Sequence, residues 1–332
     1  MWWRSVIFTG LLFGTFVVIV PHLLWLVSFI VGKIAHFRVS YAPFGWTALS
    51  LLLILWGLLA YGRYIGMWQI RVTEVEYASN DVPSAFDGYR ILHISDLHAD
   101  TYHDNPEALQ HIVNRINEQK PDIILFTGDM MTGSMDGVIP HVETLHSLTA
   151  KDGVKSILGN HDFFIYDRKY HSIGERLAAA DSLTRLEEQQ LGWQVLRNSN
   201  IMLYRGKDSI AIAGVDNING GQGFRTIQKG DLSKAMCGIN GAFTVLMTHD
   251  PSHWTAEVLP RSNVQITLSG HTHAAQVRLF GWSMAHLSFR ECDGRYDHEG
   301  RMLYVNAGLG CTAPFRIGCP SEITVITLKR TE

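Results

Sequence analysis

The sequence predicts an α/β fold preceded by two helices that span a membrane, and two observations support this prediction. From residue 91 onward, short apolar runs that end in polar side chains alternate with helical patterns. Before that point the chain has no acidic residue until Glu74, and most of this stretch is apolar. A length of 332 residues suits one large domain with an appendage.

Two runs without charge lie in the N-terminal segment, at Val6 to Val31 and Phe44 to Tyr61. Each meets or approaches the roughly 20 apolar residues that cross a bilayer as a helix. Aromatic residues gather at their ends, where amphipathic rings favour the membrane interface: Trp2, Trp3, Trp46, Tyr61, Tyr64 and Trp68. We therefore predict a membrane anchor over residues 1–68, with transmembrane helices at about 6–31 and 44–66, and a second domain over residues 69–332.

A secretory signal peptide is the main alternative for the first run. That run is long for the apolar part of a signal peptide, and no small-residue cleavage site precedes the second run. Two spans would place both chain ends on one side of the membrane. Lys33 and Arg38 lie between the runs and Arg4, Arg63 and Arg71 on their flanks, so the positive-inside rule slightly favours a cytoplasmic second domain.

Composition argues against several classes of protein. A net charge of -3 gives no electrostatic basis for binding nucleic acid, so no nucleic-acid partner is expected. Two spans without an intramembrane Asp, Glu, Lys or Arg give little support to a transporter or channel. The four cysteines have no Cys-x-x-Cys spacing, which disfavours a zinc finger: Cys237, Cys292, Cys311 and Cys319. Free thiols are the simplest interpretation, and a bridge among the last three is the alternative.

Five apolar strands are predicted to end at side chains that can bind metal ions. The runs are Ile91–Ile94, Asp122–Thr127, Val154–Leu158, Phe243–Met247 and Val264–Leu268. They precede Asp96-Leu-His98, Gly128-Asp129, Gly159-Asn160-His161-Asp162, Thr248-His249-Asp250 and Gly270-His271-Thr272-His273, in that order. A helix over Pro106–Gln119 makes the first two strands a parallel crossover unit. Carboxyl ends of parallel strands meet at the edge where α/β folds bind ligands.

Each motif taken singly has an ordinary structural explanation. Gly-Asp after a strand is common turn chemistry, Asn160 could cap the next element, and His249 could be a hydrogen-bonded core histidine. Five such motifs at five strand ends outweigh that explanation. We predict seven metal ligands: Asp96, His98, Asp129, Asn160, His249, His271 and His273. Seven ligands are too many for one ion and suit two.

The donor set also limits the metal. Carboxylates, imidazoles and one amide suit Mn, Fe, Zn, Co or Mg, with Mn favoured here. The set contains no thiolate, which disfavours a structural zinc site. Paired divalent ions are a recurring solution for phosphoester hydrolysis.

These five motifs together resemble the signature of the calcineurin-like metallophosphoesterases, over almost all of residues 74–328. The strings Ile-Ser-Asp-Leu-His, Gly-His-Thr-His-Ala-Ala-Gln-Val-Arg-Leu and Tyr-Val-Asn-Ala-Gly-Leu-Gly resemble the YkuE-like branch of membrane-associated bacterial members. Ala274-Ala275 stands where this branch often has two glycines, and Ala307 stands where Arg is common. None of these departures is at a predicted ligand, and they are expected at the rim of the substrate pocket.

The resemblance implies a four-layer α/β/β/α sandwich and a role for each motif residue. Asp96, His98 and His273 would hold one ion. Asn160, His249 and His271 would hold the other, and Asp129 would bridge the two. His161 would donate a proton to the leaving oxygen, and Asp162 would orient His161. The implied reaction is cleavage of a phosphoester or pyrophosphate bond by a metal-bridging hydroxide.

The resemblance implies a metal-dependent hydrolase in a bacterial inner membrane, whose partners are the bilayer and a phosphorylated substrate. A lipid-linked substrate such as UDP-2,3-diacylglucosamine fits a membrane anchor. The alternative is a phosphodiesterase or phosphatase acting on a soluble nucleotide or phosphoester. A non-catalytic membrane scaffold is disfavoured because all seven ligands and His161 are present.

Several other polar residues are expected to lie outside the site. His93, inside a strand, suits a buried hydrogen-bonded role, and His103 suits an exposed loop. For Arg316 and Glu322 a structural ion pair is favoured over a phosphate contact. The charged stretch from Ile173 to Gln190 is predicted to be a helix that covers a sheet, with a lid over the pocket as the alternative.

Overall fold

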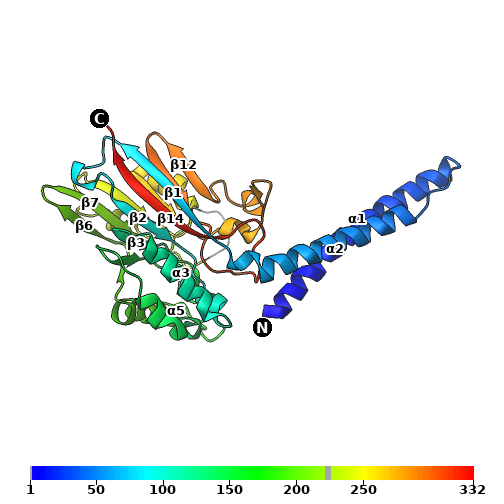
Figure 1. The fold of residues 1–332 in the computed structure, drawn as a ribbon, viewed down its shortest axis with the longest axis horizontal. Helices are drawn as coiled ribbons and strands as arrows, with labels where there is room; N and C mark the ends of the chain where they lie inside the picture. The colour runs from blue at the N-terminus through cyan, green and yellow to red at the C-terminus, as the bar shows by residue number, and fades with distance from the viewer. Residues whose placement is uncertain (1, 221–225) are drawn as a thin grey trace.

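The computed structural model describes residues 2–220 and 226–332. For residues 2–6 it describes the backbone alone. Two long helices project from one end of an α/β body (Figure 1). The body contains two six-stranded sheets and a short two-stranded one.

The first sheet has the strand order β1-β14-β2-β3-β4-β5. Its strands are β1 (Ile70–Ser79), β14 (Ser321–Arg330), β2 (Arg90–Ile94), β3 (Ile123–Phe126), β4 (Val154–Ser156) and β5 (Gln194–Val195). All neighbours are parallel except β14 and β2, which are antiparallel. The predicted β2–helix–β3 unit is therefore parallel, with Ile91 paired to Ile123.

The second sheet has the order β12-β13-β9-β8-β7-β6. Its strands are β12 (Gly294–His298), β13 (Arg301–Val305), β9 (Ile266–Ser269), β8 (Phe243–Met247), β7 (Asp208–Gly214) and β6 (Ser199–Arg205). The four inner strands are parallel and the two outer ones pair antiparallel. The sequence patterns predicted β8 and β9 here, whereas the other four strands have no chemical motif at their ends.

Three apolar cores separate four layers, which confirms the α/β/β/α sandwich. The central core lies between the sheets and includes Ile91, Ile212 and Leu268. A second core packs the first sheet against α3 (Pro106–Glu118), α4 (Val142–His146) and α5 (Ile173–Leu186). A third packs the other sheet against α6 (Leu232–Ala235), α7 (Leu259–Arg261) and the π-helical turn η8 (Trp254–Val258). Consecutive side chains of the inner strands are buried on both faces, which explains their continuous apolar runs.

Ser172 caps the N-terminus of α5, and its side chain forms a capping box with Glu175. Its residues Leu183 and Leu186 are buried in the core beside the first sheet. The helix therefore covers that sheet, as predicted. A π-helical turn, η7 (Glu187–Leu191), extends it to Gly192.

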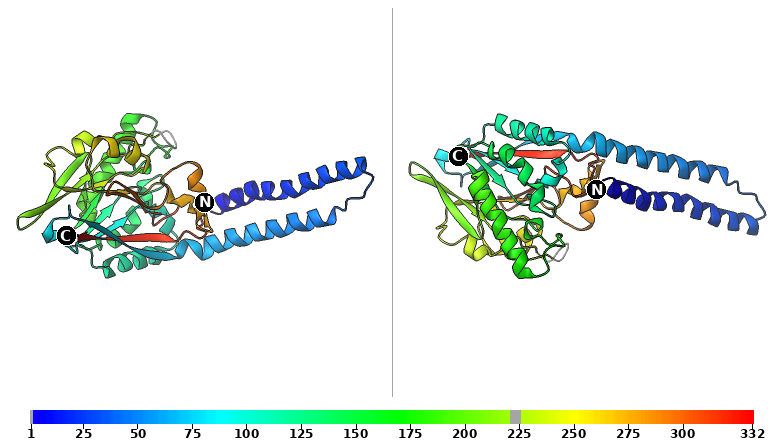
Figure 2. Two further views of the ribbon diagram at one scale, coloured as in Figure 1. Left: turned by 90° about the horizontal axis from the view of Figure 1, so that it is seen from above. Right: turned by 90° about the horizontal axis from the view of Figure 1, so that it is seen from below.

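The helices α1 (Trp2–Ile34) and α2 (Ala42–Tyr64) form an antiparallel pair, which lies side by side in Figure 2. Both are long and apolar enough to cross a membrane. Gly10 and Gly14 of α1 face Trp56 and Leu52 of α2, so small residues permit close packing. The helix α1 continues across Pro21 without a break. Most other side chains of the pair are exposed, as expected of surfaces that contact lipid.

Candidate metal centre

The predicted ligands lie on loops that leave the carboxyl ends of β2, β3, β4, β8 and β9. These loops require unusual backbone geometry. Five of the seven predicted ligands have φ in the left-handed region, between +40° and +70°: Asp96, His98, Asp129, His271 and His273. Such a backbone costs about 1–3 kcal/mol per residue and occurs mainly at functional sites. The surrounding contacts therefore hold these side chains in positions that the local sequence does not favour.

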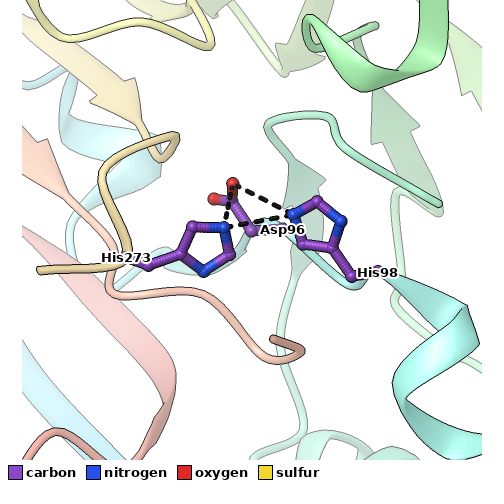
Figure 3. A group of neighbouring side chains, drawn as sticks. All are labelled: Asp96, His98 and His273. Carbon is purple, nitrogen blue, oxygen red and sulfur yellow. Dashed lines mark hydrogen bonds and ion pairs between the residues drawn. The ribbon is translucent and has the colours of Figure 1, made fainter. Parts of the chain in front are cut away.

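Three buried side chains form a first cluster, shown in Figure 3. His98 Nε2 lies 3.1 Å from His273 Nε2, and His273 Nε2 lies 3.3 Å from Asp96 Oδ1. His98 Nε2 is also 3.7 Å from Asp129 Oδ2. The loops after three different strands thus direct their ligand atoms to one point.

A second cluster shares the carboxylate of Asp129. Its Oδ2 lies 3.1 Å from His249 Nε2, which in turn lies 3.1 Å from Asn160 Oδ1 and 3.2 Å from His271 Nδ1. All seven predicted ligands are therefore brought together, in the two groups expected from the resemblance, with Asp129 between them. Their roles as ligands remain a proposal.

The arrangement fits divalent ions. Ligand atoms about 2.0–2.2 Å from one ion lie roughly 3.0–3.5 Å apart. The 3.1–3.3 Å spacings in the two clusters match this range. The Nδ1–H of His249 donates to the carbonyl oxygen of Thr127 at 2.8 Å, so Nε2 is the ring nitrogen directed toward the cluster. Two pairs of ring nitrogens face each other, in His98 and His273 and in His249 and His271. The two nitrogens of each pair would repel each other without a cation or proton between them.

Burial and charge set the protonation of these groups. Burial lowers the pKa of His98 to about 3 and holds the pKa of His273 well below its usual value, so both are neutral and able to bind metal. Burial also opposes the charged form of His249, but the adjacent Asp129 carboxylate outweighs it and raises the pKa of His249 to about 10. Metal uptake at the second cluster would therefore release a proton.

His161 lies beside the carboxylate of Asp129, but its Nε2 is farther from that carboxylate than the Nε2 atoms of His98 and His249 are. Its backbone N–H donates to Asp129 Oδ1 at 2.8 Å, and its Nδ1–H donates to the carbonyl oxygen of Thr132 at 2.6 Å. The free Nε2 lies 4.0 Å from Asp129 Oδ2. The ring of Tyr166 packs on the imidazole with centroids 4.4 Å apart. Thr132 and Tyr166 were not predicted, because no motif marks the loop after Gly128-Asp129 or the residues after Asp162.

Asp162 was expected to orient His161, and the structure corrects this role. The two oxygens of Asp162 accept the backbone N–H groups of Asp129, Met130 and Gly159, at 2.7–2.9 Å. The carboxylate thus fixes the backbone at Asp129 and Met130 and the neighbouring loop at Gly159. The orienting contact to His161 comes from Thr132 instead. Burial and the nearby Asp129 charge raise the pKa of Asp162 to about 7.

Glycines beside the ligands permit the close approach of these loops. A Cβ on Gly270 would overlap Ser95 Oγ and Asp96 Oδ2, and one on Gly128 would overlap the backbone of Gly159. Gly128 also has a φ of +92°, which glycine adopts without strain. Ala274 and Ala275 have φ of +49° and +50°, a conformation that glycine favours, which accounts for the glycines expected at these positions.

The remaining polar residues have structural contacts. His93 is buried and its Nε2 lies 2.9 Å from Thr127 Oγ1, as expected. Arg316 and Glu322 were predicted to form an ion pair, but each has other partners. Buried Arg316 donates to the carbonyl oxygens of residues 307, 308, 310 and 319, and Glu322 pairs with Arg71 at 3.2 Å. All four cysteines are free, and only Cys237 is exposed.

The calcineurin-like phosphoesterase family model matches residues 89–275, which span all five motifs and more than half of the chain. The chain belongs to this family. Calcineurin-like phosphoesterases are metal-dependent hydrolases, and this member carries the hydrolase fold with candidate metal-ligand clusters at its strand ends.

Three relatives are similar to this chain over most of its length, and one of them is a transmembrane protein. The chain is 33% identical to the metallophosphoesterase YkuE of Bacillus subtilis, over 82% of this chain and 90% of that one. It is 29% identical to a transmembrane protein with metallophosphoesterase domain of Danio rerio, over 90% of this chain and 66% of that one. It is 27% identical to the UDP-2,3-diacylglucosamine pyrophosphatase LpxG of Chlamydia trachomatis, over 77% of this chain and 88% of that one. The second relative and the two apolar helices indicate a membrane protein.

Proposed function

We propose that this phosphoesterase holds two divalent ions and hydrolyses a lipid-linked phosphoester or pyrophosphate at a membrane surface. The observation that carries the proposal is the pair of ligand clusters joined by Asp129. In this proposal Asp96, His98 and His273 hold one ion, and Asn160, His249 and His271 hold the other. Two bound ions would neutralise phosphoryl charge and lower the pKa of a water molecule between them. Manganese is the proposed metal, because the donors are oxygen and imidazole atoms.

His161 has the geometry of a general acid. The Thr132 carbonyl fixes one ring nitrogen as a donor, so that Nε2 is the nitrogen free to carry a proton toward a leaving oxygen. The ring of Tyr166, tilted against the imidazole, limits its rotation. Asp162 acts by holding the loop of Asp129 and has no direct part in the proton transfer.

The lipid-linked substrate is supported by the anchor and by one relative. Residues 1–68 are proposed to anchor the catalytic domain, residues 69–332, to a bacterial inner membrane, with that domain on the cytoplasmic side. The relative LpxG is a pyrophosphatase of UDP-2,3-diacylglucosamine, a pyrophosphate that carries acyl chains. An enzyme and substrate on the same surface meet without the substrate leaving the bilayer. A soluble nucleotide or phosphoester is the alternative substrate.

A hydrolysis screen tests the proposal. The detergent-solubilised full chain is assayed under manganese with aryl phosphomonoesters, phosphodiesters, nucleotide sugars and UDP-2,3-diacylglucosamine. We expect the acylated pyrophosphate to have the highest kcat/KM. Asp129→Asn is the control, because loss of the shared ligand should remove bound metal and reduce every activity at least about 100-fold. Cleavage restricted to aryl esters would exclude the lipid substrate, and full metal occupancy in Asp129→Asn would exclude the bridging role.

A further inference from the structure

Nine consecutive residues of the catalytic domain display an unusual number of large apolar side chains. Between positions 279 and 287 the exposed ones are Leu279, Phe280, Trp282, Met284 and Leu287, and Phe280 is fully exposed. Elsewhere in the described part of residues 69–332, exposed large apolar side chains occur singly, for example Tyr204 on β6. Scattered apolar residues are normal on a surface, whereas a contiguous group marks a site of interaction.

This 279–287 segment has a defined backbone. It comprises the hairpin of β10 (Arg278–Leu279) and β11 (Trp282–Ser283), followed by the 3-10 turn η10 (Met284–Leu287). Both turn residues, Phe280 and Gly281, have positive φ, as tight two-residue hairpins require. The Ser283 hydroxyl donates to the carbonyl oxygen of Ala274 and so ties the segment to the ligand loop. The apolar side chains are therefore held outward by an ordered hairpin.

The segment begins where the catalytic domain contacts the anchor. The N–H of Arg278 donates to the carbonyl oxygen of Ile317 at 2.8 Å. Ile317 is buried against Leu59 of α2, and the N–H of Arg316 donates to the carbonyl oxygen of Gly62 at 3.1 Å. Leu59 belongs to the charge-free run of α2, so this contact lies near the level where α2 leaves the bilayer. Figure 2 shows the gold-to-orange part of the chain beside this end of the helical pair.

The segment also adjoins the metal centre. It follows His273 by six residues, and the ring of Phe289 just beyond it lies 5.5 Å from the imidazole of His271. The Thr272 hydroxyl, between the two histidines, donates to the carbonyl oxygen of Cys292. The ligand loop is thus joined to the segment through Ser283 and to the residues just beyond it through Thr272.

The charges around the segment suit a phospholipid surface. Residues 277–290 contain no Asp or Glu, and the side chain of Arg290 is 83% exposed while its Nε lies 3.5 Å from the carboxylate of Glu291. The ring of Trp282 stacks on that of His286, 6.3 Å between centroids. Apolar and aromatic residues next to an exposed cation are typical of elements that enter the boundary between acyl chains and head groups.

We propose that the 279–287 segment inserts into the bilayer leaflet next to the anchor and presents the ligand loop of His271 and His273 to the membrane surface. An acylated phosphate would then reach the metal centre past Phe289 while its acyl chains stay in the leaflet. The inference rests on the proposed membrane anchoring, and its substrate consequence rests on the proposed lipid substrate. Insertion itself is measurable without any activity.

Fluorescence quenching tests the insertion. In the full chain, Cys292, Cys311 and Cys319 are buried, so Cys237 is the one exposed thiol. Phe280→Cys in a Cys237→Ser background is labelled with a nitrobenzoxadiazole fluorophore and placed in nanodiscs of phosphatidylethanolamine and phosphatidylglycerol. Unsubstituted protein labelled at Cys237 is the matched control. We expect the label at position 280 to be quenched several-fold more by lipids with a nitroxide on acyl carbon 5 than by aqueous iodide. The label at Cys237 should show the reverse order.

Each outcome decides the proposal. Iodide quenching at position 280 equal to that at Cys237 would show a water-exposed hairpin and overturn the insertion. Protection from both quenchers would indicate a second protein molecule on the hairpin, which also overturns it. Leu287→Cys in the same background gives a second label position and should repeat the lipid quenching. If the lipid quenching is found while the substrate screen yields only soluble esters, the insertion stands and the lipid substrate alone fails.

Discussion

The imidazole of His161 shows how little freedom one side chain of this site retains. Thr132 holds its Nδ1, Asp129 accepts its backbone N–H, and Tyr166 packs on its face. A general acid held in this way supports proton transfer worth about 100-fold to 10,000-fold in rate. We expect His161→Ala to lower kcat within this range while both metals stay bound, as measured by steady-state kinetics and elemental analysis.

A matched histidine provides the control for this prediction. His111 is exposed on α3 and belongs to no ligand loop, so His111→Ala should keep the kcat of the unsubstituted enzyme. Loss of metal from His161→Ala would instead assign this residue to the ligand set. Full activity of His161→Ala on the best substrate would remove it from the mechanism.

Asp162 acts through the backbone, so its substitution should have a different result. Its carboxylate accepts three N–H groups around Asp129 and Gly159. Asp162→Ala leaves these buried donors without their partner and loosens the loop that carries the bridging ligand. Loss of such a supporting contact costs about 10- to 100-fold in metal affinity. Competition with a fluorescent chelator measures this, and Glu118→Ala on the exposed side of α3 should keep the original affinity.

At the scale of elements, the junction of α5 and η7 contains a buried carboxyl group with one partner. Glu187 Oε2 accepts the hydroxyl hydrogen of Ser156 on β4 at 2.5 Å, and its Oε1 has no hydrogen-bond partner. Burial holds the pKa of Glu187 well above its usual value, so the folded state keeps this group protonated. The unfolded chain releases that proton near its ordinary pKa of 4.5.

This difference makes stability depend on pH. The folded state binds one more proton than the unfolded state above pH 4.5, so the free energy of unfolding falls as pH rises toward the folded pKa, by about 1.4 kcal/mol per pH unit. Glu187→Gln keeps the shape without the titration. We expect this variant to melt several degrees above the unsubstituted protein at pH 8 and near it at pH 4.5. Glu188→Gln, at the exposed neighbouring position, should not change the melting temperature; equal effects of both substitutions would refute the assignment.

The elements differ in how far the sequence could predict them. The strands before the ligand motifs were predictable, because apolar runs such as Phe243–Met247 end abruptly at polar residues and are buried on both faces. The hairpin of β6 and β7 was not predicted: the apolar run Ile201–Tyr204 leads to no ligand-type residue, and β6 is half-exposed along its length instead of buried on both faces.

The same distinction holds within the site. All seven predicted ligands converge, because each is fixed by its place at a strand end. The contacts of Asp162 and Thr132 depend on how two loops fold back on each other, at positions where Asp129 and its neighbours have left-handed backbone. Local residue patterns do not predict such contacts between loops. The exposure of the 279–287 segment could not be predicted either, because an apolar stretch in sequence does not reveal whether it is buried.

For the whole molecule, bound metal should contribute to stability. Two clusters of buried carboxylates and imidazoles lie between the sheets' carboxyl edges, and removal of cations leaves these groups without compensation. A ligand present at about 100 times its Kd adds roughly 2.7 kcal/mol. We expect chelation to lower the melting temperature by about 5–10 °C and manganese to restore it. Asp129→Asn should melt at one temperature with and without chelator, and an equal chelator effect in that variant would place the stabilising ions elsewhere.

The contact between anchor and catalytic domain determines whether the molecule moves as one body at the membrane. Gly62 of α2 lies against the 313–317 loop: a Cβ there would come within 2.8 Å of Ile317 Cγ1 and 3.1 Å of the Arg316 carbonyl oxygen. Gly57, little more than one helical turn earlier, has no atom within 4 Å of its Cβ position. The two glycines therefore form a matched pair on one helix.

Gly62→Ala should force the loop away from α2, whereas Gly57→Ala should be neutral or slightly stabilising, because alanine favours helix. Hydrogen exchange of the full chain in nanodiscs measures this, with at least about tenfold faster exchange expected in residues 313–317 of Gly62→Ala alone. Because the same loop pairs with the start of the 279–287 segment, its loosening should also reduce lipid quenching of a label at position 280. Faster exchange with unchanged quenching would mean that the hairpin keeps its depth independently of α2, and equal exchange in both variants would mean that the loop adapts to the added methyl group.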